Sequence, residues 1–161
     1  MKRTKTRMAI CLTLLTMVLI FIWGNSCLPA PQSRAFSLWF RNLIAPLFGW
    51  PIVTRPGTSG RGVLRKVAHF IEFAGLGLCL SWLVHMLRTR KWEIFLLTLF
   101  TGVTVAFIDE GIQFFIPGRG PGINDVGIDT LGVLLGIGII TLIAYINQQK
   151  NKNHLLEEQI Q

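Results

Sequence analysis

The stretch AFIDEGIQFFIPGRGPGINDVGIDTLGVLLG, residues 106–136, joins two strongly apolar segments through a short turn rich in glycine and proline. It holds four of the eight Asp and Glu residues of the chain, with Asp109 and Glu110 before the turn and Asp125 and Asp129 after it. Charged side chains are costly inside a membrane and are placed there where they have partners or a function. The stretch therefore indicates two membrane helices whose acidic ends meet at the same depth.

Outward from this stretch, the rest of the chain is also built from apolar segments. The 161 residues are 51% hydrophobic, which is too apolar for an ordinary soluble domain of this size. Crossing the hydrocarbon layer takes about 20 residues, within a range of about 17 to 25. The apolar segments predict an all-α integral membrane bundle with transmembrane helices over about residues 8–24, 66–87, 92–116 and 125–146.

The domain organisation follows from these segments. A basic N-terminus, residues 1–7, precedes a single transmembrane domain over residues 8–146, and a polar tail follows over residues 147–161. Between the first two helices, RAFSLWFRNLIAPLFGW (residues 34–50) has polar residues on one narrow helical face. This pattern fits a short helix lying in the membrane interface, and an irregular loop packed on the bundle is the alternative.

The formal net charge of +8 does not indicate nucleic-acid binding, because the Lys and Arg residues flank the apolar segments instead of covering one face. No nucleic-acid partner is expected. Cys11, Cys27 and Cys79 show no metal-binding spacing and imply no disulfide framework. The start MKRTKTR followed by an apolar run resembles a signal peptide, with possible cleavage after LPA, but we expect the first helix to be retained.

Basic residues in short loops also predict the orientation. Lys and Arg residues precede the first helix, fill the turn RTRK at residues 88–91 and follow the fourth helix. All of these lie on one side if the helices alternate, so both termini are predicted to be cytoplasmic. The basic loop over residues 24–66 opposes this orientation, but long loops count for less.

With that orientation, three helices bring their polar residues to the outer face of the membrane. Arg65, His69 and Glu72 fall within about 60° on the second helix, and Asp125 and Asp129 within about 40° on the fourth. These positions give two sets of candidate residues, one catalytic and one for binding. The candidate catalytic residues are His69, Glu72, Asp109, Glu110 and Asp125, and the candidate binding residues are Arg65, Lys66, Gln113, Arg119 and Asp129.

The acidic stripe of the fourth helix continues as Gly132 and Gly136, a small-residue seam that allows another helix to approach closely. The carboxylates are therefore expected to face the interior of the bundle. A purely structural network of ion pairs that fixes the helix register is the alternative to a functional site.

Two parts of the sequence, RKVAHFIEFAGLG (residues 65–77) and DEGIQFFIPGRGPGINDVGIDTLGVLLG (residues 109–136), resemble the signature of the VanZ-like family of small bacterial membrane proteins. The matching positions are Lys66, His69-Phe70, Glu72-Phe73, Asp109-Glu110, Gln113, Pro117-Gly118-Arg119, Asp125 and Asp129. At Asp129, many relatives carry Asn. The family is named for an accessory protein of glycopeptide-resistance clusters, so the resemblance implies the bacterial cell membrane and a link to lowered teicoplanin susceptibility.

Three kinds of function fit these residues. The first is an enzyme, or an enzyme-like binding protein, that acts on an envelope lipid or a lipid-linked glycan. In it, His69 transfers a proton, Glu72 orients His69, and Arg119 holds a phosphate or carboxylate. The second is a non-catalytic membrane module that binds a glycopeptide, a lipid or a partner and needs the same residues for structure or recognition. The third is a small transporter or channel, which the absence of an inverted repeat makes less favoured.

A metal ion is an additional hypothesis for the same residues. His69 with Glu72, Asp109 or Asp125 offers mainly oxygen ligands, which suit a divalent ion such as Mg²⁺ or Mn²⁺. A lone histidine among acids is nevertheless common without any metal, so the sequence leaves the cofactor open.

Overall fold

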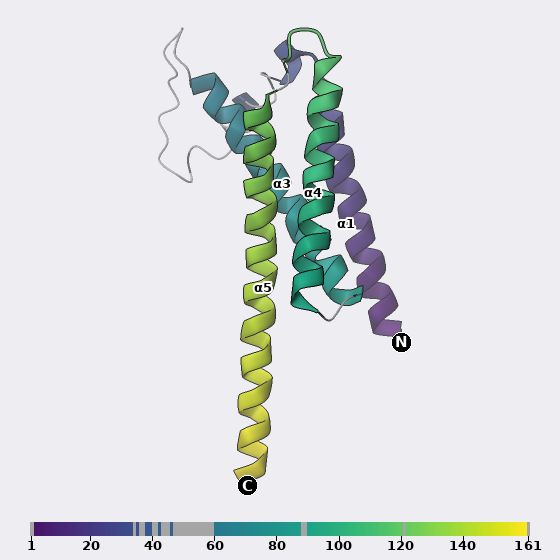
Figure 1. The fold of residues 1–161 in the computed structure, drawn as a ribbon, viewed down its shortest axis with the longest axis vertical. Coiled ribbons are helices and arrows are strands. Elements are labelled where there is room, and N and C mark those ends of the chain that lie inside the picture. Colours follow the sequence, from purple (N-terminus) through teal and green to yellow (C-terminus); the bar gives the residue numbers. More distant parts are fainter. Residues whose placement is uncertain are drawn as a thin grey trace.

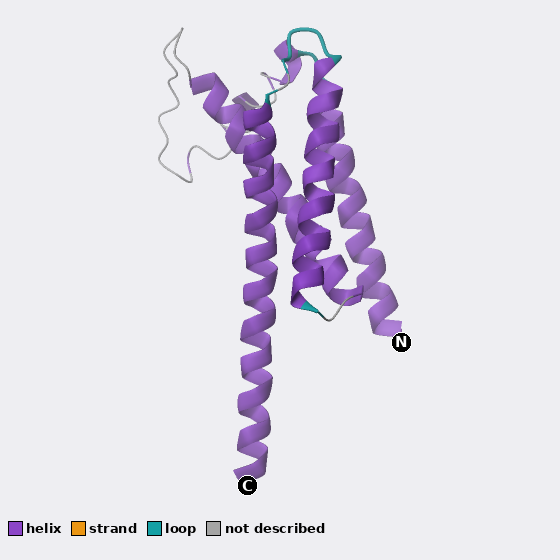
Figure 2. Ribbon diagram, in the orientation of Figure 1, coloured by secondary structure: helices purple, strands orange, loops and turns teal. Residues whose placement is uncertain are grey.

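The protein is a bundle of long helices. The computed structural model describes residues 2–33, 35, 38, 39, 42, 46, 60–87, 90–120 and 122–160. Its long helices are α1 (Lys2–Ser26), α3 (Gly60–Leu87), α4 (Lys91–Phe114) and α5 (Ile123–Ile160) (Figure 1). Figure 2 shows helices and loops and no strand in this described part of the chain. The predicted all-α fold is confirmed.

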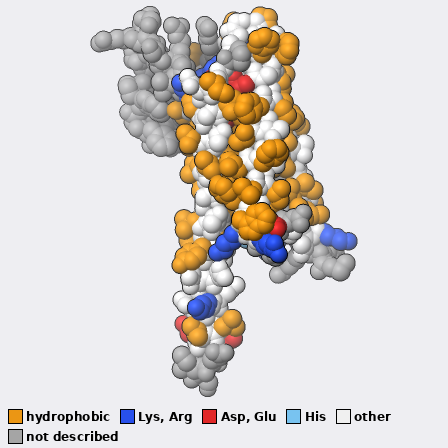
Figure 3. Space-filling model, viewed as in Figure 1, with side chains coloured by type: hydrophobic (Ala, Val, Ile, Leu, Met, Phe, Trp, Pro, Cys, Tyr) orange, Lys and Arg blue, Asp and Glu red, His pale blue; other side chains and the backbone are white. Residues whose placement is uncertain are grey.

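Each long helix is suited to cross a membrane. The 4 candidate spans are Thr4–Ser26, Arg65–Leu87, Lys91–Phe114 and Ile123–Glu158, by length and composition. Large apolar side chains also cover much of the bundle's surface (Figure 3), including Phe100, Phe107, Leu131 and Leu142. An apolar exterior of this kind is solvated by lipid tails. The chain is therefore a multi-pass membrane protein in contact with membrane lipids.

The helices alternate in direction, and this sets which polar residues can meet. Both termini lie at the same end of the molecule, together with the turn between α3 and α4 (Figure 1). The other end holds the C-terminus of α1, the N-terminus of α3 and the turn between α4 and α5. We call this second end the polar end, because the candidate residues of three helices lie there.

The turn between α4 and α5 has a defined geometry. Pro117 has no backbone N–H, and its ring disfavours helical backbone at the preceding residue. Helix α4 accordingly ends at Phe114, two residues before the end of the apolar segment. Gly118 adopts a positive φ of 77°, which glycine allows without steric cost. The backbone N–H of Arg119 then donates to the carbonyl of Ile116 at 3.1 Å, which closes the turn.

Helices α3 and α5 cross at very short range through glycines of both helices. A Cβ atom on Gly132 would lie 2.5 Å from the carbonyl oxygen of Phe70, and one on Gly77 would lie 2.5 Å from that of Val133. A Cβ atom on Gly136 would likewise collide with the backbone of Gly77 and Leu78. The predicted small-residue seam is thus the site of the α3–α5 crossing.

The apolar core lies directly beside this crossing. Its buried residues come from all four long helices and include Ile22, Phe73, Leu76, Val105, Ala106, Val126, Val133 and Ile137. Close packing of such side chains fixes the relative positions of helices. It therefore holds the first turns of α5 against α3, where the polar residues are found.

The predicted interfacial helix over residues 34–50 lies mostly outside the described residues. Residues 35, 38, 39, 42 and 46 are described, and all are helical.

Candidate functional site

A group of polar side chains is buried at the polar end of the bundle, between α3, α4 and α5. His69 is 3% exposed, and Asp109 and Asp129 are fully buried. The other buried members are Glu110, Gln113 and Asp125. Buried polar groups are stable only when other groups satisfy them, so the contacts of each residue matter.

His69 of α3 lies between carboxylates of the two neighbouring helices. Its Nδ1 atom is 3.4 Å from Oδ1 of Asp129 on α5 and 3.9 Å from Oδ2 of Asp109 on α4. Neither contact has the geometry of a hydrogen bond, and Nδ1 has no hydrogen-bond partner in the structure. The imidazole is therefore close enough to interact with both acids electrostatically, without being locked to either.

Glu110 completes a compact set with these three residues. One ligand-type atom from each of His69, Asp109, Glu110 and Asp129 lies within 4.8 Å of the corresponding atoms of the others. We call these four buried residues the His–acid cluster. The carboxylate of Glu110 is also held in place, since its Oε2 accepts a hydrogen bond from the backbone N–H of Gly122 at 2.8 Å.

Gln113 holds Asp109 in place and links α4 to α1. Its Nε2 atom donates to Oδ2 of Asp109 at 2.8 Å and to the hydroxyl of Ser26 at 3.2 Å. Arg119 reaches the same point of α1, because its guanidinium donates to the backbone carbonyl of Ser26 at 3.4 Å. The end of α1 is therefore part of the wall of the site.

Glu72 lies apart from the His–acid cluster. Its Oε1 accepts a hydrogen bond from the side-chain amide of Asn25 at 2.9 Å, so Glu72 contacts α1. Sequence reasoning did not single out Asn25 or Ser26. The signal that could have found them is the polar run GNS at the end of the first apolar segment, which alternation of the helices places at the polar end.

Arg65 and Asp125 form a salt bridge between the first turn of α5 and α3. Lys66, by contrast, is exposed on the surface of α3. Burial is the main cause that lowers the pKa of Arg119, and the nearby charge of Arg65 adds to it. An arginine stays protonated in proteins despite such effects, so Arg119 is a half-buried positive charge beside the cluster.

Several acceptor atoms of the cluster remain without a hydrogen-bond partner in the structure. They are Oδ1 of Asp109, Oε1 of Glu110, and Oδ1 and Oδ2 of Asp129. Leaving buried carboxylate oxygens unsatisfied is costly where no water solvates them. These atoms are therefore the ones available to a ligand, a cation or a proton.

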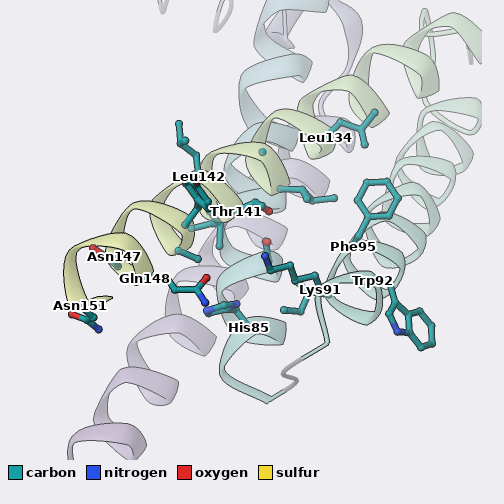
Figure 4. Close-up of a pocket in the computed structure, with 17 residues that line it drawn as sticks. His85, Lys91, Trp92, Phe95, Leu134, Thr141, Leu142, Asn147, Gln148 and Asn151 are labelled. Atoms are coloured by element: carbon teal, nitrogen blue, oxygen red, sulfur yellow. The ribbon is translucent and has the colours of Figure 1, made fainter. Parts of the chain in front are cut away.

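A separate apolar groove of about 1170 Å³ lies at the opposite end of the bundle. It is lined by residues of α3, α4 and α5, and His85, Lys91 and Gln148 point into it (Figure 4). None of the candidate site residues lines it.

Neither the search of curated proteins nor the search of solved structures gave a match. The family model described as VanZ/LLP1 matches residues 8–144, which include every residue of the His–acid cluster. That match covers well over half of the chain and confirms the resemblance in the sequence. The chain belongs to the VanZ/LLP1 family.

Proposed function

We propose that this protein binds an anionic component of the bacterial cell envelope, a lipid or lipid-linked glycan, and acts on it through the His–acid cluster. One observation carries this proposal. A buried histidine lies between two carboxylates that belong to different helices, with a third carboxylate in reach and acceptor atoms left unpaired. Intramembrane ionisable residues in such a setting are functional more often than structural.

The neighbouring arginine explains why the ligand is anionic. Arg119 lies in the turn between α4 and α5 and is half-buried, so the residue is accessible in part. Arginine binds phosphate and carboxylate groups with two parallel hydrogen bonds. A head group held there would lie beside His69 and Asp109, which are positioned for transfer of a proton.

The orientation of the bundle sets which face of the membrane this site serves. Basic residues at the end with both termini include Arg7, Arg90, Lys91, Lys150 and Lys152. This end would be cytoplasmic by the distribution of Lys and Arg, and the polar end would then be at the outer face of the cell membrane. A component of the outer leaflet is the substrate that such a site reaches.

Lowered susceptibility to glycopeptides such as teicoplanin would follow if the protein changes the envelope component to which these antibiotics bind. The test is the teicoplanin susceptibility of a sensitive Gram-positive host that expresses wild type, Asp109→Asn or Glu93→Gln. Asp109→Asn removes a cluster carboxylate with little change of volume. Glu93→Gln is the matched control, because Glu93 lies at the opposite end of the same helix.

We expect lower susceptibility with wild type and with Glu93→Gln, and loss of the effect with Asp109→Asn at an equal membrane level. Equal protection by all three would contradict a role for the cluster. Absence of protection by wild type would contradict the link to glycopeptides.

A non-catalytic structural module is the second candidate, and one observation favours it. The polar contacts join different helices, as in Arg65 with Asp125, Asn25 with Glu72 and Gln113 with Ser26. In that case Asp109→Asn would reduce the amount of protein in the membrane. A blot of the membrane fraction, made alongside the susceptibility test, therefore separates the two functions.

A further inference from the structure

We infer that the His–acid cluster is a binding site for a divalent cation, with Mn²⁺ as the ion that its ligands fit best. This inference goes beyond the proposed function and does not depend on it, since a cation site is measurable whether or not an envelope component binds.

The first support is the spacing of the four ligand atoms. One atom from each of His69, Asp109, Glu110 and Asp129 lies within 4.8 Å of the others. Ligand atoms lie about 2.0 to 2.6 Å from a hard divalent cation. Two ligands on opposite sides of one ion are therefore about 4 to 5 Å apart. The atoms of the cluster are already at distances that a single ion can bridge.

The second support is independent of the acids and comes from His69. This side chain is only 4% exposed, and its Nδ1 atom is directed at Asp129 and Asp109 without a hydrogen-bond partner. A buried imidazole nitrogen with no partner is costly unless something else occupies its lone pair or its proton has an acceptor. A metal ion among the acids would satisfy it directly.

The third support is the balance of charge. The cluster places the carboxylates of Asp109, Glu110 and Asp129 together out of contact with water. Of the two nearby arginines, Arg65 forms a salt bridge with Asp125 and Arg119 donates to the carbonyl of Ser26. Mutual repulsion of closely spaced carboxylates is relieved by a bound cation, which is often the largest charge in such a site.

Neighbouring donors orient the carboxylates as in known metal sites. Gln113 donates to Oδ2 of Asp109, and the backbone N–H of Gly122 donates to Oε2 of Glu110, both at 2.8 Å. The other oxygen of each carboxylate, Oδ1 and Oε1, is left without a partner. Hydrogen bonds donated to metal ligands in this way fix the orientation of the ligands and strengthen metal binding.

The ligand types select the ion. Carboxylate oxygens suit Mg²⁺, Ca²⁺ and Mn²⁺, whereas imidazole suits transition metals. Mn²⁺ accepts both, and no cysteine belongs to the described cluster to favour a softer ion. Mn²⁺ also gives a direct magnetic signal, which makes it the appropriate probe.

The experiment uses the full chain in lipid nanodiscs, stripped with a chelator and titrated with MnCl₂. The electron paramagnetic resonance signal of free Mn²⁺ reports how much ion is bound. Wild type is compared with Asp129→Asn, Asp109→Asn and Glu93→Gln. Glu93 is an acid in the first turn of α4, at the opposite end of the bundle from the cluster.

We expect saturable binding of one ion per wild-type chain. Asp129→Asn and Asp109→Asn should each weaken it by at least about tenfold, because even the loss of a hydrogen bond to a metal ligand costs about 10 to 100-fold. Glu93→Gln should change it far less, since that residue supplies no ligand. An equal loss in all three variants would mean general electrostatic attraction and would overturn the site, as would the absence of saturable binding by wild type.

A measurement on wild type keeps the inference testable if the variants fold poorly. Electron spin echo modulation detects a ¹⁴N nucleus bonded to Mn²⁺, and we expect this coupling from the imidazole of His69. The coupling should disappear in His69→Gln with Mn²⁺ still bound by the three acids. Bound Mn²⁺ in wild type without any ¹⁴N coupling would overturn the assignment. The susceptibility test and this binding test can fail separately, so the two proposals remain distinguishable.

Discussion

Nδ1 of His69 and Oδ1 of Asp129 lie 3.4 Å apart, across the interface of α3 and α5. Gly132, one turn after Asp129, permits that approach because its missing side chain leaves room for the carbonyl of Phe70. The small-residue seam and the His–acid cluster thus both depend on the close packing of α3 against α5. Any change that separates α3 from α5 should affect both the stability of the bundle and the geometry of the site.

Gly132→Ala should therefore destabilise the protein. Its Cβ atom would lie 2.5 Å from the backbone oxygen of Phe70, so the helices must separate. Overpacking of this kind costs about 1 to 3 kcal/mol. Thermal unfolding in detergent measures the change, and Gly138→Ala is the matched control because a Cβ atom there meets nothing within 4 Å. Equal melting temperatures for the two variants would contradict the close crossing.

The salt bridge between Arg65 and Asp125 should stabilise the α3–α5 pair. Arg65 is 33% exposed and Asp125 only 6%, so solvent screens the interaction in part. We expect a coupling energy of about 1 kcal/mol from a double-mutant cycle of Arg65→Gln and Asp125→Asn. The neighbouring Lys66→Gln should show no coupling with Asp125→Asn, because Lys66 is exposed. A coupling energy of zero for Arg65 would show that the pair does not form in the membrane.

Glu72 and Asp129 should respond differently to neutralisation. Glu72→Gln keeps an oxygen that accepts the hydrogen bond of Asn25, so the contact with α1 should survive. Asp129→Asn removes a charge from the His–acid cluster itself. We expect Glu72→Gln to retain lowered teicoplanin susceptibility and Asp129→Asn to lose it, at equal membrane levels. The reverse result would move the functional site towards α1.

Gln113→Met should reduce stability more than Ser26→Ala does. Methionine preserves most of the volume but removes the donor that satisfies Oδ2 of Asp109. Loss of a partner for a buried acceptor costs about 1 to 3 kcal/mol. Ser26→Ala removes the longer hydrogen bond, at 3.2 Å, and leaves the one from Gln113 to Oδ2 of Asp109 in place. Chemical denaturation in detergent measures both, and equal losses would show that Asp109 does not depend on Gln113.

Cys27 tests the orientation of the bundle. It is an exposed free cysteine just beyond the end of α1, at the polar end. A membrane-impermeant maleimide should label it in intact cells if the polar end is at the outer face. Asn151→Cys in a Cys27→Ser background should be labelled only after the membrane is opened, since residue 151 lies on the exposed C-terminal part of α5. The opposite labelling pattern would place the site on the cytoplasmic side.

The helices and the meeting of their polar residues were predictable because both follow from simple periodicity. Apolar length fixes the number of spans, and alternation then places Asp109, Asp129 and His69 at one end. The partners of individual side chains were not predictable in this way. His69 and Glu72 share a face of α3, yet one contacts α4 and α5 and the other contacts α1. Such a difference depends on the crossing angles of helices, which no spacing along one helix contains.

The contribution of α1 was missed for a related reason. Asn25 and Ser26 are uncharged, so a search for ionisable groups passes over them. Their roles arise from satisfying the acids of other helices, through Glu72 and Gln113. A search for any polar residue at the depth of the carboxylates would have included them.

Helix α5 is unbroken from Ile123 to Ile160, and its polar part after Ile146 extends past the other helices (Figure 1). At about 1.5 Å per residue, that extension reaches about 20 Å beyond the apolar segment. One continuous helix therefore begins at the wall of the His–acid cluster and ends well beyond its own apolar segment. A rotation or tilt of the whole helix imposed at its far end would also move Asp129 relative to His69, because Asp129 belongs to the same helix.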